Sequence, residues 1–214
     1  MATEEERKVT DMGNPAKPTG AAGAEMLARM NDSHAPVTEW GLSHISVAAD
    51  ARVLDIGCGG GATLRRLAAR APQGHITGMD YSPVSVACSA ELNRAAVESG
   101  LMQVLEGSVE AMPFADDSFD TITTVESFYF WPDPQENLRE VYRVLKPGGT
   151  FLLIADIHED GALPATAREN IARYRLFNPT QEQFRELFRA AGFTRTAIHT
   201  KEGEHWIAVC GAKD

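Results

Sequence analysis

The stretch "VLDIGCGGGATLRRLAAR", from Val53 to Arg70, joins a strand-like run to a helix-like run through a cluster of glycines. Four of the five residues from Gly57 to Gly61 are glycine, and Asp55 lies just ahead of them. Glycine loses more backbone entropy on folding than any other residue, so such a cluster indicates a turn that needs bare backbone. The stretch therefore predicts a strand, a turn that a ligand can approach closely, and a helix whose first N–H groups are free.

Strand-like and helix-like runs alternate along the rest of the chain, which is typical of a parallel α/β sheet. The strand-like runs that follow are "HITGMD", "MQVLEGS", "FDTITTVES" and "TFLLIAD". Near the end, "TRTAIHT" and "HWIAVCGA" are separated only by "KEGE". A connection that short cannot hold a parallel crossover, so this pair is antiparallel. We expect a doubly wound, mostly parallel sheet with an antiparallel last strand.

The composition changes along the chain divide it into segments. Residues 1–24 are rich in charge and then in Pro, Gly and Ala, which buries little apolar surface and predicts a flexible N-terminal arm. Residues 25–48 carry apolar side chains at helical spacing and are expected to form a helical lid segment. Residues 49–214 hold the alternation and form the main domain, in which residues 158–179 are a short lid insertion.

Charge and composition exclude several classes of function. The net charge of −10 opposes binding to the phosphates of nucleic acids. No apolar run approaches the roughly 20 residues that cross a bilayer. The three cysteines and six histidines show neither a disulfide framework nor metal-ligand spacing, so no metal site is predicted. We expect a cytoplasmic monomer or homodimer that acts on a small molecule, with no nucleic-acid or membrane partner.

Two interpretations of the glycine turn compete. The run "GCGGGA" satisfies the dinucleotide pattern G-x-G-x-x-A, and Asp80 follows Gly57 by 23 positions, near the spacing of the acid that binds a ribose diol. An NAD-dependent oxidoreductase is therefore one interpretation. Asp55 favours another, because a carboxylate just before a phosphate-binding turn has no evident use. It suits a cofactor with a cationic amino-acid end and no phosphate.

Several motifs together resemble those of class I S-adenosylmethionine-dependent methyltransferases. They are "VLDIGCGGG", "GMDYS", "EGSVEAMPFADDSFD", "REVYRVLKPGG" and "HWIAVCGA", in family order over residues 51–212. The resemblance is greatest to the small-molecule methyltransferases of the ubiquinone/menaquinone-biosynthesis type. It implies an α/β, Rossmann-like, doubly wound sheet of seven strands, with S-adenosylmethionine as the cofactor and S-adenosylhomocysteine as the product.

The resemblance also implies roles for individual residues at the cofactor. Asp55 would face the methionine end of the cofactor, inside a turn formed by Gly57, Cys58, Gly59 and Gly61. Asp80 would take both ribose hydroxyls, and Tyr81 would stack on the adenine. Glu126 would lie beside the sulfonium.

The adenine edge would meet Ser108, Val109 and Glu110. Here the chain departs from the family pattern, because Ser108 stands where the usual residue is Asp.

The acceptor is expected to lie among the segments "NDSHAPVTEWGLSH", "ESFYFWPD" and "ADIHEDG", whose aromatic residues favour an apolar or aromatic molecule. Transfer from a sulfonium is an in-line displacement, for which the protein aligns the acceptor and excludes water. If the acceptor must lose a proton, His34, Tyr129 and His158 are the candidate bases. A non-catalytic relative that kept the fold is a third possibility beside the methyltransferase and the oxidoreductase.

Overall fold

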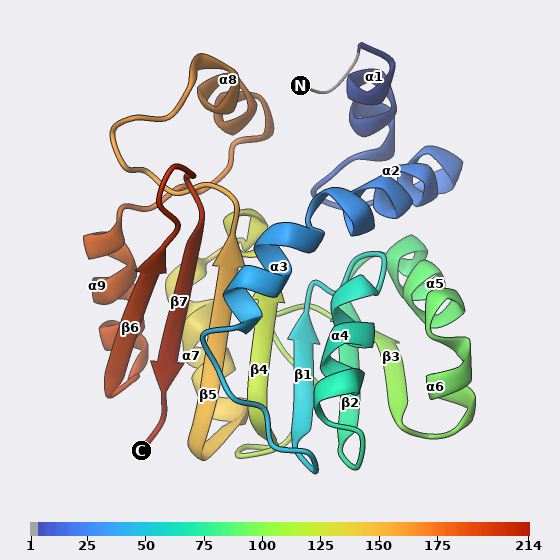
Figure 1. Cartoon of the computed structure of the whole chain (residues 1–214), viewed down its shortest axis with the longest axis vertical. Helices are drawn as coiled ribbons and strands as arrows, with labels where there is room; N and C mark the ends of the chain where they lie inside the picture. Colours follow the sequence, from blue (N-terminus) through green and yellow to red (C-terminus); the bar gives the residue numbers. More distant parts are fainter. Residues whose placement is uncertain (1–3) are drawn as a thin grey trace.

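The computed structural model describes residues 4–214, and its centre is one seven-stranded sheet. The strands are β1 (Arg52–Ile56), β2 (His75–Asp80), β3 (Met102–Glu106), β4 (Phe119–Val125), β5 (Leu145–Ala155), β6 (Arg195–Thr200) and β7 (Ile207–Ala212). Their order is β3-β2-β1-β4-β5-β7-β6 (Figure 1). β1 to β5 pair in parallel, whereas β7 is antiparallel to both of its neighbours. The expected fold class is confirmed.

Helices cover both faces of this sheet and one of its ends. They are α1 (Glu4–Gly13), α2 (Gly20–Ser33), α3 (Ala35–Leu42), α4 (Ala62–Arg70), α5 (Pro83–Leu92), α6 (Arg94–Glu98), α7 (Pro134–Val144), α8 (Ala165–Tyr174) and α9 (Gln181–Ala191). One face is covered by α3 to α6, and the other by α7 and α9 (Figure 1). The helices α1, α2 and α8 lie above the carboxyl ends of β1, β4 and β5 (Figure 1).

The sheet separates two apolar cores, one for each covered face. On the side of α7 and α9, the ring of Phe151 stacks on that of Phe188 at a centroid distance of 5.5 Å. On the side of α3 and α4, Leu64 and Leu67 pack with Val53. The central strands are covered on both sides, which explains why residues 151–155 of β5 are apolar at every position rather than at every second one.

The N-terminal segment differs from its prediction as a flexible arm. Residues 1–3 lie outside the described residues, and residues 4–24 form α1 and the start of α2. Arg29 of α2 donates to the Glu6 carbonyl at 3.0 Å, and the Tyr174 hydroxyl of α8 donates to Asp11 at 2.8 Å. Composition predicted too little apolar burial to fold this segment, but polar contacts and closely packed small residues such as Gly13 against Ala22 supply the partners.

The two segments predicted to be lids have different surroundings. In residues 25–48, α2 lies over the strand ends, but α3 packs against β5, where a Cβ on Gly41 would come within 2.5 Å of Ile154 Cδ1. In residues 158–179, α8 lies above the strand ends together with α1 (Figure 1). Within these two segments, α2 and α8 are therefore the helices that lie over the strand ends.

Gly74, just before β2, gives a test of how tightly the strands pack. A Cβ at this position would lie 2.1 Å from the backbone oxygen of Ala51, which cannot move away without shifting β1. We expect Gly74→Ala to lower the free energy of unfolding by about 2 kcal/mol or more in denaturant titrations. Gly100→Ala is the control, since Gly100 has open space and a φ of +79°, so only backbone strain of about 1 kcal/mol applies. Equal losses in both variants would contradict this packing.

Candidate active site

A cavity of about 400 Å³ lies at the carboxyl ends of β1 and β4. This is the point at which the strand order reverses, because β2 and β3 extend to one side and β5 to the other. Open α/β sheets bind ligands in the crevice formed at such a point. The cavity wall includes residues of α1, α2 and α8 and the segments that follow β1, β2, β4 and β5.

The glycine turn forms the floor of one half of this cavity. The N–H groups of Gly57 and Cys58 both donate to the Met79 carbonyl of β2, at 2.8 and 3.1 Å. Gly57 has a φ of +71°, and a Cβ there would lie 2.1 Å from Ser127 Oγ. At Gly59, by contrast, the nearest atom to an added Cβ is 3.5 Å away, so its backbone borders open space. The turn presents bare backbone to a ligand, as its composition predicted.

Side chains from two helices hold the carbonyl groups of the turn. The Gly59 carbonyl accepts from Ser89 Oγ (2.9 Å), the Gly60 carbonyl from Asn31 Nδ2 (3.1 Å) and the Gly61 carbonyl from Asn93 Nδ2 (3.0 Å). The sequence interpretation missed these anchors. The signal was present as a buried polar stripe at helical spacing along α5, consisting of Ser82, Ser85, Ser89 and Asn93.

Asp55 lies in β1 at the base of the cavity and is 1% exposed. Its carboxyl accepts a hydrogen bond of 2.6 Å from the hydroxyl of Thr123 in β4. Burial, together with the charge of Asp80, raises the pKa of Asp55 to about 7 against the opposing effect of the Thr123 hydrogen bond. The free carboxyl is therefore partly protonated near neutral pH, and a cation bound beside it would favour the ionised form.

Asp80 ends β2 and is held by main-chain donors. Its Oδ2 accepts from the Gly59 N–H at 3.0 Å and its Oδ1 from the Ser82 N–H at 2.9 Å. Burial raises the pKa of Asp80, although these bonds act in the opposite direction. The cap of α5 is Ser82, whose hydroxyl accepts from the Ser85 N–H at 3.2 Å, so Asp80 is not needed for that role.

The segment between α1 and α2 is bonded to the residues that follow β2. The Tyr81 hydroxyl donates to the Ala16 carbonyl, and Ser82 Oγ donates to the Pro18 carbonyl at 2.6 Å. The ammonium of Lys17 lies 5.0 Å from the centre of the Tyr81 ring. Residues 15–18 thus lie across the cavity edge at Tyr81, which lines the cavity and remains 39% exposed.

The residues after β3 form a third part of the wall. Ser108, Val109 and Glu110 all line the cavity. The Ser108 hydroxyl accepts from the Glu110 N–H at 3.2 Å and lies 3.0 Å from its Oε2, to which it donates. The serine that departs from the family pattern therefore bonds within its own turn and orients Glu110.

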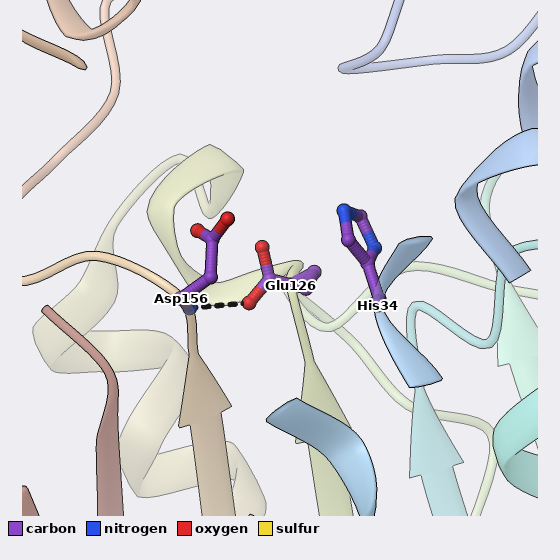
Figure 2. Close-up of side chains that lie close together, drawn as sticks. All are labelled: His34, Glu126 and Asp156. Atoms are coloured by element: carbon purple, nitrogen blue, oxygen red, sulfur yellow. Dashed lines mark hydrogen bonds between the residues drawn. The ribbon is translucent and has the colours of Figure 1, made fainter. Parts of the chain in front are cut away.

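The other half of the cavity contains the side chains of His34, Glu126 and Asp156, which point toward one another (Figure 2). Glu126 follows β4 with a φ of +54°, a strained conformation for a residue other than glycine. Its Oε2 accepts from the Tyr129 hydroxyl at 2.8 Å and its Oε1 from the Asp156 N–H at 2.5 Å. Burial, and the neighbouring carboxyl, raise the pKa of Asp156 well above its usual range.

His34 lies at the end of α2 and carries the third polar side chain. Burial lowers the pKa of His34, and the charge of Asp156 only partly offsets this, so the ring is neutral at pH 7. Neither ring nitrogen has a hydrogen-bond partner among residues 4–214. His34 therefore offers a free lone pair to whatever occupies this half of the cavity.

Comparisons with known proteins identify the family. Residues 54–153 match the family model described as a methyltransferase domain. The 2-methyl-6-phytyl-1,4-hydroquinone methyltransferase 1 of Oryza sativa subsp. japonica is 34% identical over 155 residues, which make up 72% of this chain and 44% of that protein. The ubiquinone/menaquinone biosynthesis C-methyltransferase UbiE of Geotalea daltonii is 37% identical over 51% of this chain and 47% of its own length. Residues 54–153 thus form a methyltransferase domain, and the chain as a whole is similar to class I S-adenosylmethionine-dependent methyltransferases.

Solved structures agree with this family. The methyltransferase solved with the Trm112 activator of Haloferax volcanii has a TM-score of 0.76 and 25% identity, over 89% of this chain and 94% of that one. The phosphoethanolamine N-methyltransferase 2 of Haemonchus contortus has a TM-score of 0.78 over all of this chain and 60% of that one, but only 15% identity, and shows the fold alone. The methyltransferase described here spans less than half the length of its rice and Geotalea relatives.

The residues that line the cavity suit the cofactor of this family. Two buried carboxyls and a bare-backbone turn would meet a cationic amino acid and a ribose. Arg66 is the only Arg or Lys among the described residues of the cavity wall, and its Nε donates to Glu39 at 2.8 Å. A diphosphate would therefore find two carboxylates and no free cation on this wall. None of the comparisons supports the NAD-dependent alternative.

Two residues predicted for the site do not line the cavity. His158 is 2% exposed, and its Nδ1 lies 2.8 Å from the His205 carbonyl, so the structure gives a proposed base no access to the acceptor. Gly61 begins α4 with a φ of +84°, where a Cβ would lie 2.8 Å from the backbone of Ser89. Its role is to let α4 and α5 approach each other. The predicted site residues that do line the cavity are His34, Asp55, Gly57, Cys58, Gly59, Asp80, Tyr81, Ser108, Val109, Glu110, Glu126 and Tyr129.

Two of the residues that line the cavity, Cys58 and Tyr129, are limited in the chemistry that they can perform. Burial raises the pKa of the Cys58 thiol well above its usual range, so it stays protonated and is no nucleophile. Burial and the charge of Glu126 raise the pKa of Tyr129 well above its usual range, and its hydroxyl already donates to Glu126. Tyr129 is thus a positioning residue for Glu126 rather than a base.

Asp55→Asn tests the buried charge of this methyltransferase. Because the pKa of Asp55 is about 7 in the folded protein and ordinarily 3.8, the folded state binds more protons than the unfolded state between those values. Ionisation of Asp55 thus destabilises the ligand-free protein as pH rises through that window. We expect Asp55→Asn to raise the melting temperature, by a difference that widens from about pH 4 to pH 7 and is constant above. A difference independent of pH would contradict the raised pKa.

Proposed function

We propose that this methyltransferase transfers the methyl group of S-adenosylmethionine to a small, largely apolar acceptor. The proposal depends on one observation, a cavity that joins a half fitted to the cofactor with a half fitted to an acceptor. When bound, S-adenosylmethionine supplies a methyl group on a positively charged sulfur, which is already a good leaving group. The chain's own residues then have to bind, align and enclose the two reactants.

The cofactor half would use the two buried aspartates at its ends. Asp55 would pair with the ammonium of the methionine end, where the ionised carboxylate is otherwise uncompensated. Asp80 would accept hydrogen bonds from the two ribose hydroxyls, since its main-chain donors fix both carboxyl oxygens at the end of β2. The backbone of Gly57, Cys58 and Gly59 would lie against the cofactor between these contacts.

The adenine would lie at Tyr81 and the residues after β3. Lys17 covers the ring of Tyr81 on one side, and the remaining surface would stack on the base. Glu110, oriented by Ser108, would meet the amino edge in place of the usual aspartate, and Val109 would pack against the ring. Residues 15–18 would close over this end, so its affinity would depend on the N-terminal segment as well as on the main domain.

The acceptor half has apolar walls and a polar centre. The walls include Leu27, Met30, Phe130, Trp131 and Leu176. Relatives are named for a phytyl hydroquinone and for cycloartenol, which are largely apolar small molecules with hydroxyl groups. These names and the apolar walls support an acceptor of that kind, whose hydroxyl would face His34 and whose apolar part would lie under α2 and α8.

The polar centre would control the proton and charge of the acceptor. His34 is neutral and unpaired at pH 7, and Glu126 beside the reacting methyl would keep its orientation through Tyr129. Closure by α2 and α8 would exclude water from the reaction. This arrangement favours an active enzyme over a relative without catalytic function, because polar groups are present at the transfer site and Glu126 is oriented by hydrogen bonds.

Composition and comparison also bear on the partners and the location of the protein. No helix among residues 4–214 is long and apolar enough to span a membrane. The acidic composition and small cavity favour a metabolite over a nucleic acid, and a monomer or homodimer stays our prediction. A cytoplasmic location likewise stays a prediction, since the rice relative is named as chloroplastic.

Ligand-induced thermal shifts distinguish the two cofactors. A ligand that binds only the folded state adds about 2.7 kcal/mol of stability at 100 times its dissociation constant. We expect S-adenosylmethionine to raise the melting temperature and NAD to leave it unchanged. Asp80→Ala should abolish the shift, whereas Glu98→Ala, an exposed acid on α6, should retain it. A shift with NAD alone would refute the proposed cofactor.

His34→Ala tests the acceptor half. Release of S-adenosylhomocysteine would be measured against a panel of hydroquinones, phenols, sterols and amines. We expect His34→Ala to lower turnover about a hundredfold or more with unchanged cofactor affinity, because a group that handles the acceptor's proton contributes on that scale. His158→Ala should keep its turnover and lose stability instead. Full turnover in His34→Ala would mean that catalysis rests on alignment alone.

A further inference from the structure

The three polar side chains of the acceptor half come from separate elements. His34 follows α2, Glu126 follows β4 and Asp156 follows β5. Each offers one nitrogen or oxygen atom, and these atoms all lie within 4.8 Å of one another (Figure 2). Three segments that are well separated in sequence thus place one imidazole and two carboxyls around a common point at the cavity wall.

No Lys or Arg side chain lies against the carboxyl groups around that point in the described part of the chain. The two buried carboxyls face each other. Buried carboxylates are stable only when a cation, a shared proton or several hydrogen-bond donors compensate them. A bound cation would remove the mutual repulsion of Glu126 and Asp156, and the cavity leaves access for one.

The surrounding contacts resemble those that orient metal ligands. Ligating carboxylates in proteins are usually held by hydrogen bonds from neighbouring groups. Here Glu126 accepts from the Tyr129 hydroxyl and from the Asp156 N–H. These bonds use one lone pair on each carboxyl oxygen, so a second lone pair on each oxygen is available to a ligand. Neither ring nitrogen of His34 has a hydrogen-bond partner among residues 4–214, so one of them is available as a metal ligand.

We propose that His34, Glu126 and Asp156 together bind a divalent transition-metal ion beside the reacting methyl group. This inference rests on the proposed function, since it assigns a role to the acceptor half of the same cavity. One imidazole nitrogen with two carboxylate oxygens is a ligand set for ions such as Mn²⁺, Fe²⁺ or Zn²⁺. Bonds of about 2.0–2.2 Å require the three ligand atoms to approach one another, which rotation of these side chains within the cavity would allow.

The site would select a class of acceptor. Three protein ligands leave coordination positions open, as in catalytic metal sites. These positions would face the cavity and take an oxygen of the acceptor, so the substrate would carry a hydroxyl or enol group. The ion would orient that oxygen and lower its pKa. His34 would then act as a ligand, which gives a physical reason for its neutral state.

Mn²⁺ binding to the full chain tests this inference. The protein would be stripped with a chelator and titrated with Mn²⁺, with free Mn²⁺ measured by electron paramagnetic resonance. We expect one ion per chain. His34→Gln and Asp156→Asn should each weaken binding by about tenfold or more. Asp160→Asn is the matched control, because Asp160 also lies beside a histidine, His205 at 2.6 Å, but does not line the cavity.

Cofactor affinity, measured by calorimetry on the same samples, separates the two proposals. If S-adenosylmethionine binds every variant as it binds the parent and Mn²⁺ does not bind, the metal site is refuted and the proposed function stands. If Mn²⁺ binds equally to Asp156→Asn and Asp160→Asn, the ion lies elsewhere and the inference is refuted. If an alkylammonium ion stabilises the protein where Mn²⁺ does not, the cluster holds an organic cation instead.

Discussion

Four carboxyl groups meet at one edge of the sheet, and much of the remaining structure depends on how they are compensated. Asp55 lies in β1, Asp80 ends β2, Glu126 follows β4 and Asp156 follows β5. These are adjacent strands, so parallel pairing brings all four acids to the same crevice. Burial raises the pKa of each of them. The fold thereby builds a cavity in which a bound cation would favour the ionised form of these carboxyl groups.

This constraint explains the contrast between the two halves of the cavity. In the cofactor half, main-chain donors and a polar stripe on α5 fix a turn of bare backbone, which leaves little freedom for side chains. In the acceptor half, a strained Glu126 and a neutral His34 lie among apolar walls. A sulfonium cofactor bound as proposed would lie between carboxyl groups that each favour positive charge. The arrangement suits transfer of a methyl group from a cation better than transfer from an anionic dinucleotide.

The sequence predicted the parts of the site that depend on local pattern. The glycine turn with Asp55 and Asp80 could be recognised because a strand, a turn and a helix follow one another over a few residues. Asp156 was missed and His158 was preferred, since sequence order cannot show which of two neighbouring polar residues points into a cavity. The helices of residues 4–24 were missed because their partners, on α2 and α8, are polar and distant in sequence. The juxtaposition of His34 with two acids has no spacing signature at all.

The claim that this cavity takes up positive charge is tested most directly by proton release. Calorimetric titration with S-adenosylmethionine at pH 6, in buffers of different ionisation enthalpy, counts the protons exchanged on binding. A cation beside Asp55 lowers its pKa from about 7, so binding should release up to one proton, and Asp55→Asn should release correspondingly less. Binding heats that are independent of the buffer, or identical proton release by parent and variant, would contradict the claim.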